Sequence, residues 1–309
     1  MARMFRPRSY RQPRRATSKG KQYNPATGTV YSASDGHSSS RPSTNHAPAS
    51  LRGLSGGNLR HVSNHPLSAA IQSTSGLILY YPMSEASGTV VRDNNNGLNP
   101  GASSGVTSVA GKVGTAYDFN GTSGYVQTTD SALIRFEGGN DFSVVFLVNL
   151  DSYNNNLLPR FFEKKSLYLA LMGDSGNGKY RRVAIEVQNS TGLGNANAGA
   201  SEFWGSTQLN TGQWYMIGAS FDGNLVGTEP TVYQGKIYIN GVAETMDVIF
   251  DWPTGADSTL QSTSAFDLYI GRRRTDQARN IDGKMQHFAL FDRVLTPTEF
   301  QTLASLAGF

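Results

Sequence analysis

The sequence predicts an all-β protein: a two-sheet jelly-roll sandwich with one short C-terminal helix and a long extended basic N-terminal arm. Short apolar runs separated by Asn-Gly and Asp-Gly turns recur through residues 76–309, which is typical of sandwiches and jelly rolls. The long apolar patterns of helical period that an α/β protein needs are missing. Residues 1–75 are instead basic and rich in Ser, Asn, Gly and Pro, so they predict an extended segment outside the sandwich.

The expected strands follow one another at short intervals through the body. Residues 142–150 form an almost continuous apolar run, as expected of a strand in a sandwich core. Asn240-Gly241 is the strongest hairpin signal, because both positions of its turn favour a positive φ. The other expected strands are 77–81, two short strands around Asn120-Gly121 within 116–126, the pair 167–172 and 182–187, 214–221 before Asp222-Gly223, and 236–239 with 242–245 around the hairpin turn.

The C-terminal part of the body combines a strand with a helix. Residues 285–291 are mostly apolar, which indicates a strand covered on both faces. The motif Thr296-Pro297-Thr298-Glu299 follows, in which Thr caps a helix, Pro suits its first turn and Glu closes a capping box. Phe300 and Leu303 then fall on one face, so a closing strand leads into one short terminal helix.

Several motifs support a family assignment. An Ile-Gly pair precedes a strand that ends in an aromatic residue, followed by an Arg-Val-Leu turn and a helix that carries Glu. These features are Ile270-Gly271, Phe291, Arg293-Val294-Leu295 and Glu299, and further matches lie at 116–126, 142–151, 213–223 and 236–242. In this order they resemble the laminin-G-like members of the concanavalin A-like lectin/glucanase superfamily. The resemblance extends over residues 76–309 and implies a concanavalin A-like, laminin-G-like jelly roll.

The N-terminal 75 residues divide into two predicted segments. Residues 1–21 form a basic arm without acidic residues, whose cations are Arg3, Arg6, Arg8, Arg11, Arg14, Arg15, Lys19 and Lys21. Residues 22–75 form an extended linker, in which the spacing of His61 and His65 is not read as a metal pair because Ser63, Asn64 and Pro66 argue against a helix. We expect the arm either to remain solvated or to become ordered on contact with nucleic acid or with other subunits of a large assembly.

Charge separates the arm and linker from the body. Residues 1–75 hold 11 basic residues and one acidic residue, whereas the remainder holds 16 basic and 22 acidic residues. A basic tail on an acidic body is typical of proteins whose tail binds polyanions or acidic protein surfaces. Cysteine is absent, which fits a cytosolic, bacterial or viral product better than a disulfide-stapled secreted module. No apolar run is long enough for a membrane span, and no apolar segment follows the basic start as in a secretory signal.

The sequence predicts no enzyme. Glucanases of the resembled superfamily place paired carboxylates on one strand, whereas here Glu186 stands alone on its strand and Glu163 is followed by two lysines. His287 lies inside the closing strand and is interpreted as a packed residue rather than a catalytic base.

The resemblance implies two binding properties. Calcium is the usual ion of the family, and Asp118, Asn120 and Asp222 are the candidate ligands. However, Gly283-Lys284-Met285 is followed by Gln286-His287 where relatives often carry Asp-Glu, so we expect no required cofactor and leave calcium as an alternative. Glycan binding needs an exposed aromatic platform, for which Trp204 and Trp252 are the candidates; the alternative is that both cover the edges of the core.

Two main functions follow. The first is a non-enzymatic structural protein of a virus or bacteriophage particle, a decoration protein or a capsid- or tail-associated subunit, located in the virion, oligomeric there and anchored by its basic arm. The second is a carbohydrate-binding module at a cell surface or outside the cell that recognises surface glycans. A glucanase-type hydrolase is a third alternative.

Overall fold

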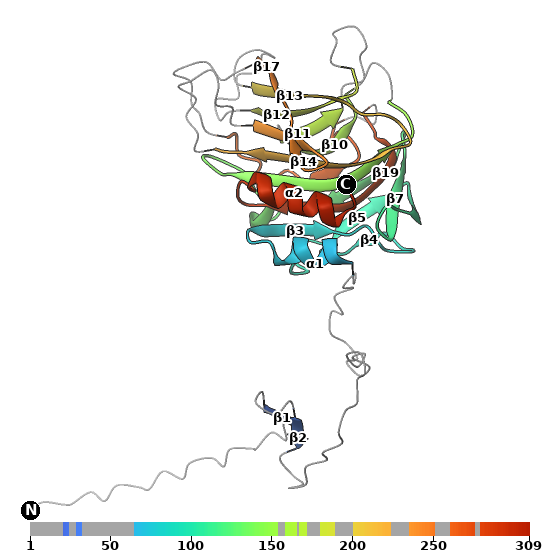
Figure 1. Cartoon of the computed structure of the whole chain (residues 1–309), viewed down its shortest axis with the longest axis vertical. Helices are drawn as coiled ribbons and strands as arrows, with labels where there is room; N and C mark the ends of the chain where they lie inside the picture. The colour runs from blue at the N-terminus through green and yellow to red at the C-terminus, as the bar shows by residue number, and fades with distance from the viewer. Residues whose placement is uncertain are drawn as a thin grey trace, which may run out of the picture. The chain divides into compact units, whose positions relative to one another are not determined.

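The computed structural model describes residues 21–24, 29–32, 65–153, 158–165, 167–171, 180–188, 200–223, 235–250, 260–275 and 279–309. The chain divides into two compact units, Met1–Gly57 and Asn58–Phe309. In the first unit, β1 (Lys21–Asn24) and β2 (Thr29–Ser32) form an antiparallel pair. The second unit is a sandwich of two antiparallel sheets with two helices, which confirms the predicted all-β fold (Figure 1).

The eight-stranded sheet is built around its longest strands. Its order is β16-β15-β14-β9-β19-β7-β6, and β3 also pairs with β19. β9 is buried at every residue, which explains its uninterrupted apolar sequence. The strands are β3 (Leu77–Tyr81), β6 (Val106–Ala110), β7 (Thr115–Asn120), β9 (Phe142–Leu150), β14 (Trp214–Phe221), β15 (Gly235–Ile239), β16 (Val242–Ala243) and β19 (Asp282–Phe291).

The nine-stranded sheet has the order β17-β13-β12-β11-β10-β18-β8-β5-β4. Its strands are β4 (Val90–Val91), β5 (Gly101–Ser104), β8 (Tyr125–Thr128), β10 (Arg160–Lys164), β11 (Leu167–Leu171), β12 (Arg182–Gln188), β13 (Ala200–Gln208), β17 (Asp247–Phe250) and β18 (Leu268–Ile270). The strands expected around Asn120-Gly121 exist as β7 and β8, but they belong to different sheets, so the turn between them crosses from one sheet to the other.

The main core lies between the two sheets. Alternate residues of the long strands enter it, for example Phe142, Val144 and Phe146 of β9, as the two-residue repeat of a strand requires. Phe146 of β9 lies 5.1 Å (ring centroids) from Phe161 of β10 and 6.1 Å from Phe288 of β19, so aromatic rings fill the centre. Each fully buried ring of this kind contributes roughly 2–3 kcal/mol of transfer free energy.

A second apolar cluster lies on the outer face of the eight-stranded sheet, beneath α1 (Pro66–Ser73) and α2 (Pro297–Leu306) (Figure 1). Phe300 of α2 stacks on Tyr238 of β15 with ring centroids 3.9 Å apart. Leu67 and Ile71 of α1 join the same cluster from successive turns of the helix. We call this covered surface the apolar face. Among the described residues there is also a short 3-10 helix, η1 (Ala132–Ile134).

The helix α1 corrects the predicted linker of residues 22–75. Pro66 argues against a helix from the sequence alone, yet it occupies the first turn of α1, where its missing N–H is not needed. The Nδ1 of His65 accepts a hydrogen bond from the backbone N–H of Leu67 and caps the helix. Residues 66–73 are therefore helical and belong to the sandwich, while residues 25–28 and 33–64 of the predicted linker lie outside the described residues.

The predicted closing strand and helix are confirmed. β19 pairs with β3, β7 and β9, and α2 begins with the expected capping box between Thr296 and Glu299. Glu299 also accepts a 2.5 Å hydrogen bond from Arg293. His287 of β19 is 3% exposed and shares a 2.7 Å hydrogen bond with the Tyr80 hydroxyl, so its packed role is confirmed. Within the described part of the chain, neither helix has the length and apolar character needed to cross a bilayer.

Candidate ligand-binding face

Polar and aromatic side chains line up across the outer face of the nine-stranded sheet. The strand register places them opposite one another, one residue from each of six neighbouring strands. Their chain neighbours Val126, Ile270, Phe162, Leu169, Ile185 and Phe203 all enter the core, so these side chains point the other way. We call this surface the polar face and the six residues the row: Gln127, Tyr269, Glu163, Tyr168, Glu186 and Glu202.

The middle of the row is tied together by hydrogen bonds. The Tyr168 hydroxyl donates to Glu186, and the Gln188 side chain donates to the other oxygen of the same carboxylate at 3.3 Å. Burial raises the pKa of the Tyr168 hydroxyl above its usual range, so this group remains a donor at physiological pH. The centre of the row is therefore a fixed arrangement of one phenol, one carboxylate and one amide.

The Glu163 carboxylate interacts with several arginines. Its carboxylate accepts a 3.3 Å hydrogen bond from the Arg160 side chain and another of 3.3 Å from the backbone N–H of Arg274. Burial raises the pKa of the Glu163 carboxyl, while Arg160 and Arg273 act to lower it. Arg160 also lies on the Tyr168 ring, 3.2 Å from its centroid. We call Arg160, Arg272, Arg273 and Arg274 the arginine cluster.

An arginine and two tyrosines form the adjoining part of the polar face. The Arg272 guanidinium lies 3.6 Å from the ring centroid of Tyr125 and 4.8 Å from that of Tyr269. All three side chains are partly exposed. Stacking against aromatic rings fixes the plane of the guanidinium while leaving its N–H groups free to donate. This part of the face offers rings and planar donors to a ligand.

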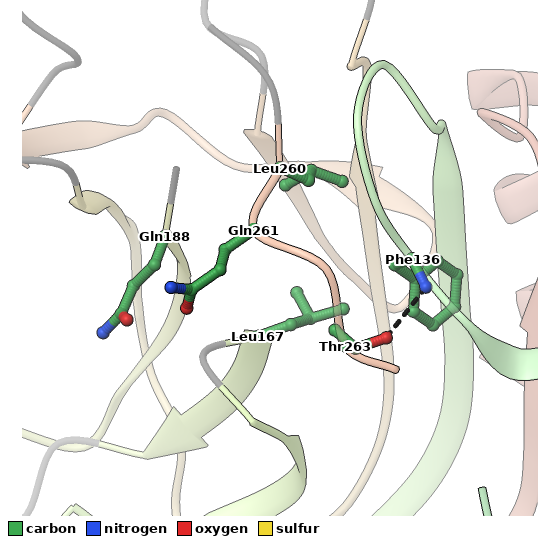
Figure 2. Close-up of a pocket in the computed structure, with 6 residues that line it drawn as sticks. All are labelled: Phe136, Leu167, Gln188, Leu260, Gln261 and Thr263. Carbon is green, nitrogen blue, oxygen red and sulfur yellow. Dashed lines mark hydrogen bonds between the residues drawn. The ribbon is translucent and has the colours of Figure 1, made fainter. Parts of the chain in front are cut away.

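A small cavity opens at the end of the same sheet. It has a volume of about 10 Å³, roughly enough for one water molecule, and is lined by Phe136, Leu167, Gln188, Leu260, Gln261 and Thr263 (Figure 2). The backbone N–H of Phe136 donates to the Thr263 hydroxyl across one wall, and Gln261 donates to the Gln188 carbonyl across another. Ligand pockets usually enclose about 300–1,000 Å³. This cavity is therefore too small for an oligosaccharide. The polar face is the better candidate, because its row is partly exposed at both ends, although Glu163 and Tyr168 in the middle are buried.

Of the two tryptophans considered for an aromatic platform, only Trp204 is described, and it is buried. Trp204 belongs to β13 and its ring is on the polar face, but it is 1% exposed, so it offers no open surface to a sugar. The alternative, that it covers an edge of the packed interior, describes it better. Trp252 lies outside the described residues.

Of the predicted arm contacts, only Lys21 is described, as the first residue of β1. The others, Arg3, Arg6, Arg8, Arg11, Arg14, Arg15 and Lys19, lie outside the described residues.

The predicted calcium ligands do not share one site. Asp118 and Asn120 lie on β7, which pairs with β19 next to the C-terminal end of β9, whereas Asp222 follows β14 near the N-terminal end of β9. The Asn120 amide oxygen accepts from the backbone N–H groups of Thr122, Ser123 and Gly124, which fixes the turn. No group of three or more candidate metal ligands occurs among the described residues. The absence of a required cofactor stays a prediction.

The sequence missed the row because its members are far apart along the chain. Glu186 stands alone on its own strand, as expected, yet Glu202 lies directly opposite it on β13. Strand β10, which carries Arg160 and Glu163, was not expected, because its sequence Arg-Phe-Phe-Glu-Lys lacks simple alternation and contains a bulge between Arg160 and Phe162. Alternation along β18 and β8 was a usable signal. Tyr269 lies between the apolar residues Leu268 and Ile270, and Tyr125 precedes the apolar Val126, so both tyrosines are predicted to point away from the core.

Known proteins support the fold. A laminin-G family profile, described as the concanavalin A-like lectin/glucanases superfamily, matches residues 120–301. The binding domain of Paraclostridial Mosquitocidal Protein 1 is 13% identical, with a TM-score of 0.53 over 74% of this chain and 52% of that one. The binding domain of botulinum neurotoxin serotype G is 17% identical, with a TM-score of 0.52 over 74% of this chain and 51% of that one.

A third similar structure is domain 4 of AbnA, a GH43 extracellular arabinanase from Geobacillus stearothermophilus, in complex with arabinotriose. It is 19% identical, with a TM-score of 0.51 over 74% of this chain and 98% of that one. This chain thus spans about half of the two toxin binding domains and nearly all of the arabinanase domain. At these identities the similarities establish the fold alone. No curated protein sequence matches the chain significantly.

Proposed function

We propose, from the premise that the chain belongs to the concanavalin A-like lectin/glucanases superfamily, that its sandwich is a non-catalytic carbohydrate-binding module. In this proposal a glycan binds along the polar face. The observation that carries it is the open end of the row, where the partly exposed rings of Tyr269 and Tyr125 lie beside the partly exposed amide of Gln127. Sugars present apolar C–H faces and hydroxyl edges, and such a row offers surfaces for both. The similar arabinanase domain, which was solved with arabinotriose, agrees with this reading.

Hydrolysis is the competing function, and the pair Glu186 and Glu202 favours it. As direct cross-strand neighbours they have Cβ atoms about 5 Å apart, and a retaining glycosidase needs carboxyls about 5 Å apart. Against it, Glu186 is already engaged by the Tyr168 hydroxyl and the Gln188 amide. A carboxylate held in this way cannot approach a sugar without losing those bonds. We therefore propose binding without cleavage.

The experiment is a glycan array followed by calorimetry on the ligands found. Tyr269→Ala is expected to weaken binding about tenfold, as for a central aromatic contact, whereas Tyr269→Phe keeps the ring and should bind almost as well as the wild type. Equal binding by all three proteins would exclude the polar face. Release of reducing ends from the bound glycan, lost in Glu186→Gln, would replace the proposal with a hydrolase.

A second candidate function rests on the charge distribution. Residues 1–75 hold 11 basic residues and one acidic residue, while the body is acidic. We propose that the basic arm anchors the protein in a virus or bacteriophage particle, with the lectin-like sandwich displayed outside. The arm would contact other subunits or packaged nucleic acid, and nucleic-acid contacts through Arg and Lys weaken steeply as salt increases.

The two functions are compatible and are tested separately. Deleting residues 1–21 should abolish incorporation into particles while leaving glycan affinity unchanged, because the arm and the polar face belong to different parts of the chain. Normal incorporation of the truncated protein would refute the anchoring role. Loss of glycan binding on truncation would show that the arm takes part in recognition.

A further inference from the structure

The polar face is divided into two halves of opposite charge. On one side of Tyr168 lie the four residues of the arginine cluster and two carboxylates. Arg160 and the backbone of Arg274 donate to Glu163, and Gln127 donates to Asp267 at 2.6 Å. On the other side lie Glu186 and Glu202, opposite each other on neighbouring strands. A ligand that spans the row therefore meets a cationic end and an anionic end.

The cationic half has donors without acceptors. The Arg160 Nη1, the Arg272 Nε and the Arg274 Nε are buried and have no hydrogen-bond partner within the described part of the chain. The Arg160 side chain is 4% exposed. Buried donors in proteins are nearly always paired, and each one left unpaired costs about 1–3 kcal/mol. An acceptor from outside the chain would remove this cost.

Two features favour an anion as that acceptor. The Arg272 guanidinium is held in plane by stacking on Tyr125 and Tyr269, so its N–H groups are already oriented. A planar guanidinium matches the two oxygens of a carboxylate or sulfate group, and such charge-assisted bonds are about twice as strong as neutral ones. Glu163 offsets only part of the positive charge of the cluster.

On the basis of the proposed function, we infer that the polar face binds an anionic glycan, with its carboxylate or sulfate group at the arginine cluster. The uncharged part of the chain of sugars then runs toward Tyr168, and its hydroxyl groups face Glu186 and Glu202. The reverse orientation would place the anion against two carboxylates, which repel it. The charge division of the face thus determines both the class of ligand and its direction.

The test uses the full chain and two matched pairs of probes. Oligogalacturonate is compared with its methyl ester, and a heparin-derived hexasaccharide with its desulfated form, so that carboxylate and sulfate are distinguished. The anionic member of one pair should bind at least tenfold more tightly, and its affinity should fall when NaCl is raised from 50 to 500 mM. Arg272→Gln should remove this preference, and Arg272→Lys, which keeps the charge but loses the planar fork, should restore part of it.

The matched control is Arg293→Gln. Arg293 follows β19 of the eight-stranded sheet, is outside the arginine cluster, and its guanidinium donates to Glu299 and to the backbone carbonyl of Ser75, so this change should alter affinity less than twofold. Thermal unfolding of each variant shows whether it is folded. Binding of neutral and anionic glycans with equal affinity, or equal loss with Arg293→Gln, would overturn the inference and leave the proposed function standing. Failure of every glycan on the array to bind would reject the proposed function itself.

Discussion

The two outer faces of the sandwich differ although both belong to antiparallel sheets of similar size. The apolar face is covered by α1 and α2, and its side chains are packed. The polar face carries arginines, carboxylates and tyrosines, several of them partly exposed. A sheet with one face already in the core can use its other face either to bury more apolar area or to present polar groups. We infer that this protein stabilises itself through one face and binds through the other.

The largest effect is expected from removing the main contact of the apolar face. Phe300→Ala should lower the free energy of unfolding by about 3–5 kcal/mol, because it removes a buried ring and leaves a cavity. The ring stacks on Tyr238, and its edge lies where a Gly218 side chain would otherwise fit. Urea unfolding measures the change. Glycan affinity of the folded fraction should not change; a loss of affinity would show that the faces are coupled.

The next effect is a pH dependence that arises on the apolar face. Burial lowers the pKa of His287 from 6.5 to about 4. Between these values the unfolded chain binds a proton that the folded chain does not, so stability is complete above pH 6.5 and falls as the pH approaches 4. The loss amounts to about 3 kcal/mol over that range.

Urea unfolding at several pH values between 7 and 4.5 tests this prediction. The range above pH 4.5 is informative because the pKa values of Asp130 and Glu299 are lowered to about 2, and their contributions are lost mainly at lower pH. His287→Asn should flatten the dependence between pH 6.5 and 4.5. An unchanged slope in that variant would assign the effect to another group.

A smaller effect is expected at the start of α2. Glu299→Gln removes the ion pair with Arg293 and weakens the capping box, which should lower the free energy of unfolding by about 1 kcal/mol. Thr298→Ala is the matched control, since Thr298 lies in the same turn and is not the cap. Differential scanning calorimetry compares the two variants. Equal melting temperatures would show that the cap is redundant with the packing of the helix.

The smallest stability effect is expected on the polar face. Tyr168→Phe removes the hydroxyl that donates to Glu186 but keeps the ring beneath Arg160. Because Glu186 is only partly buried and water can replace the lost donor, the free energy of unfolding should fall by less than about 1 kcal/mol. A loss comparable to that of Phe300→Ala, measured by urea unfolding, would show that both faces serve stability equally.

The sequence by itself determined the elements whose signals are local. The apolar run of β9, the Asn240-Gly241 hairpin and the capping box of α2 were all predicted, because each depends on residues close together in the chain. The same locality explains the error at α1, where Pro66 indicates a break or a first helical turn depending on what the helix packs against. Only packing against the apolar face decides between these readings.

Which residues make up the polar face depends on the tertiary structure alone. Its row combines residues from Gln127 to Tyr269, and no spacing along the chain shows that they are neighbours. The sequence alone leaves open whether Trp204 is an exposed platform or covers the edge of the core, and only its position in the sheet shows that it is 1% exposed. Strand order and register determine which distant side chains meet, and these depend on the cooperative burial of the whole core rather than on any single segment.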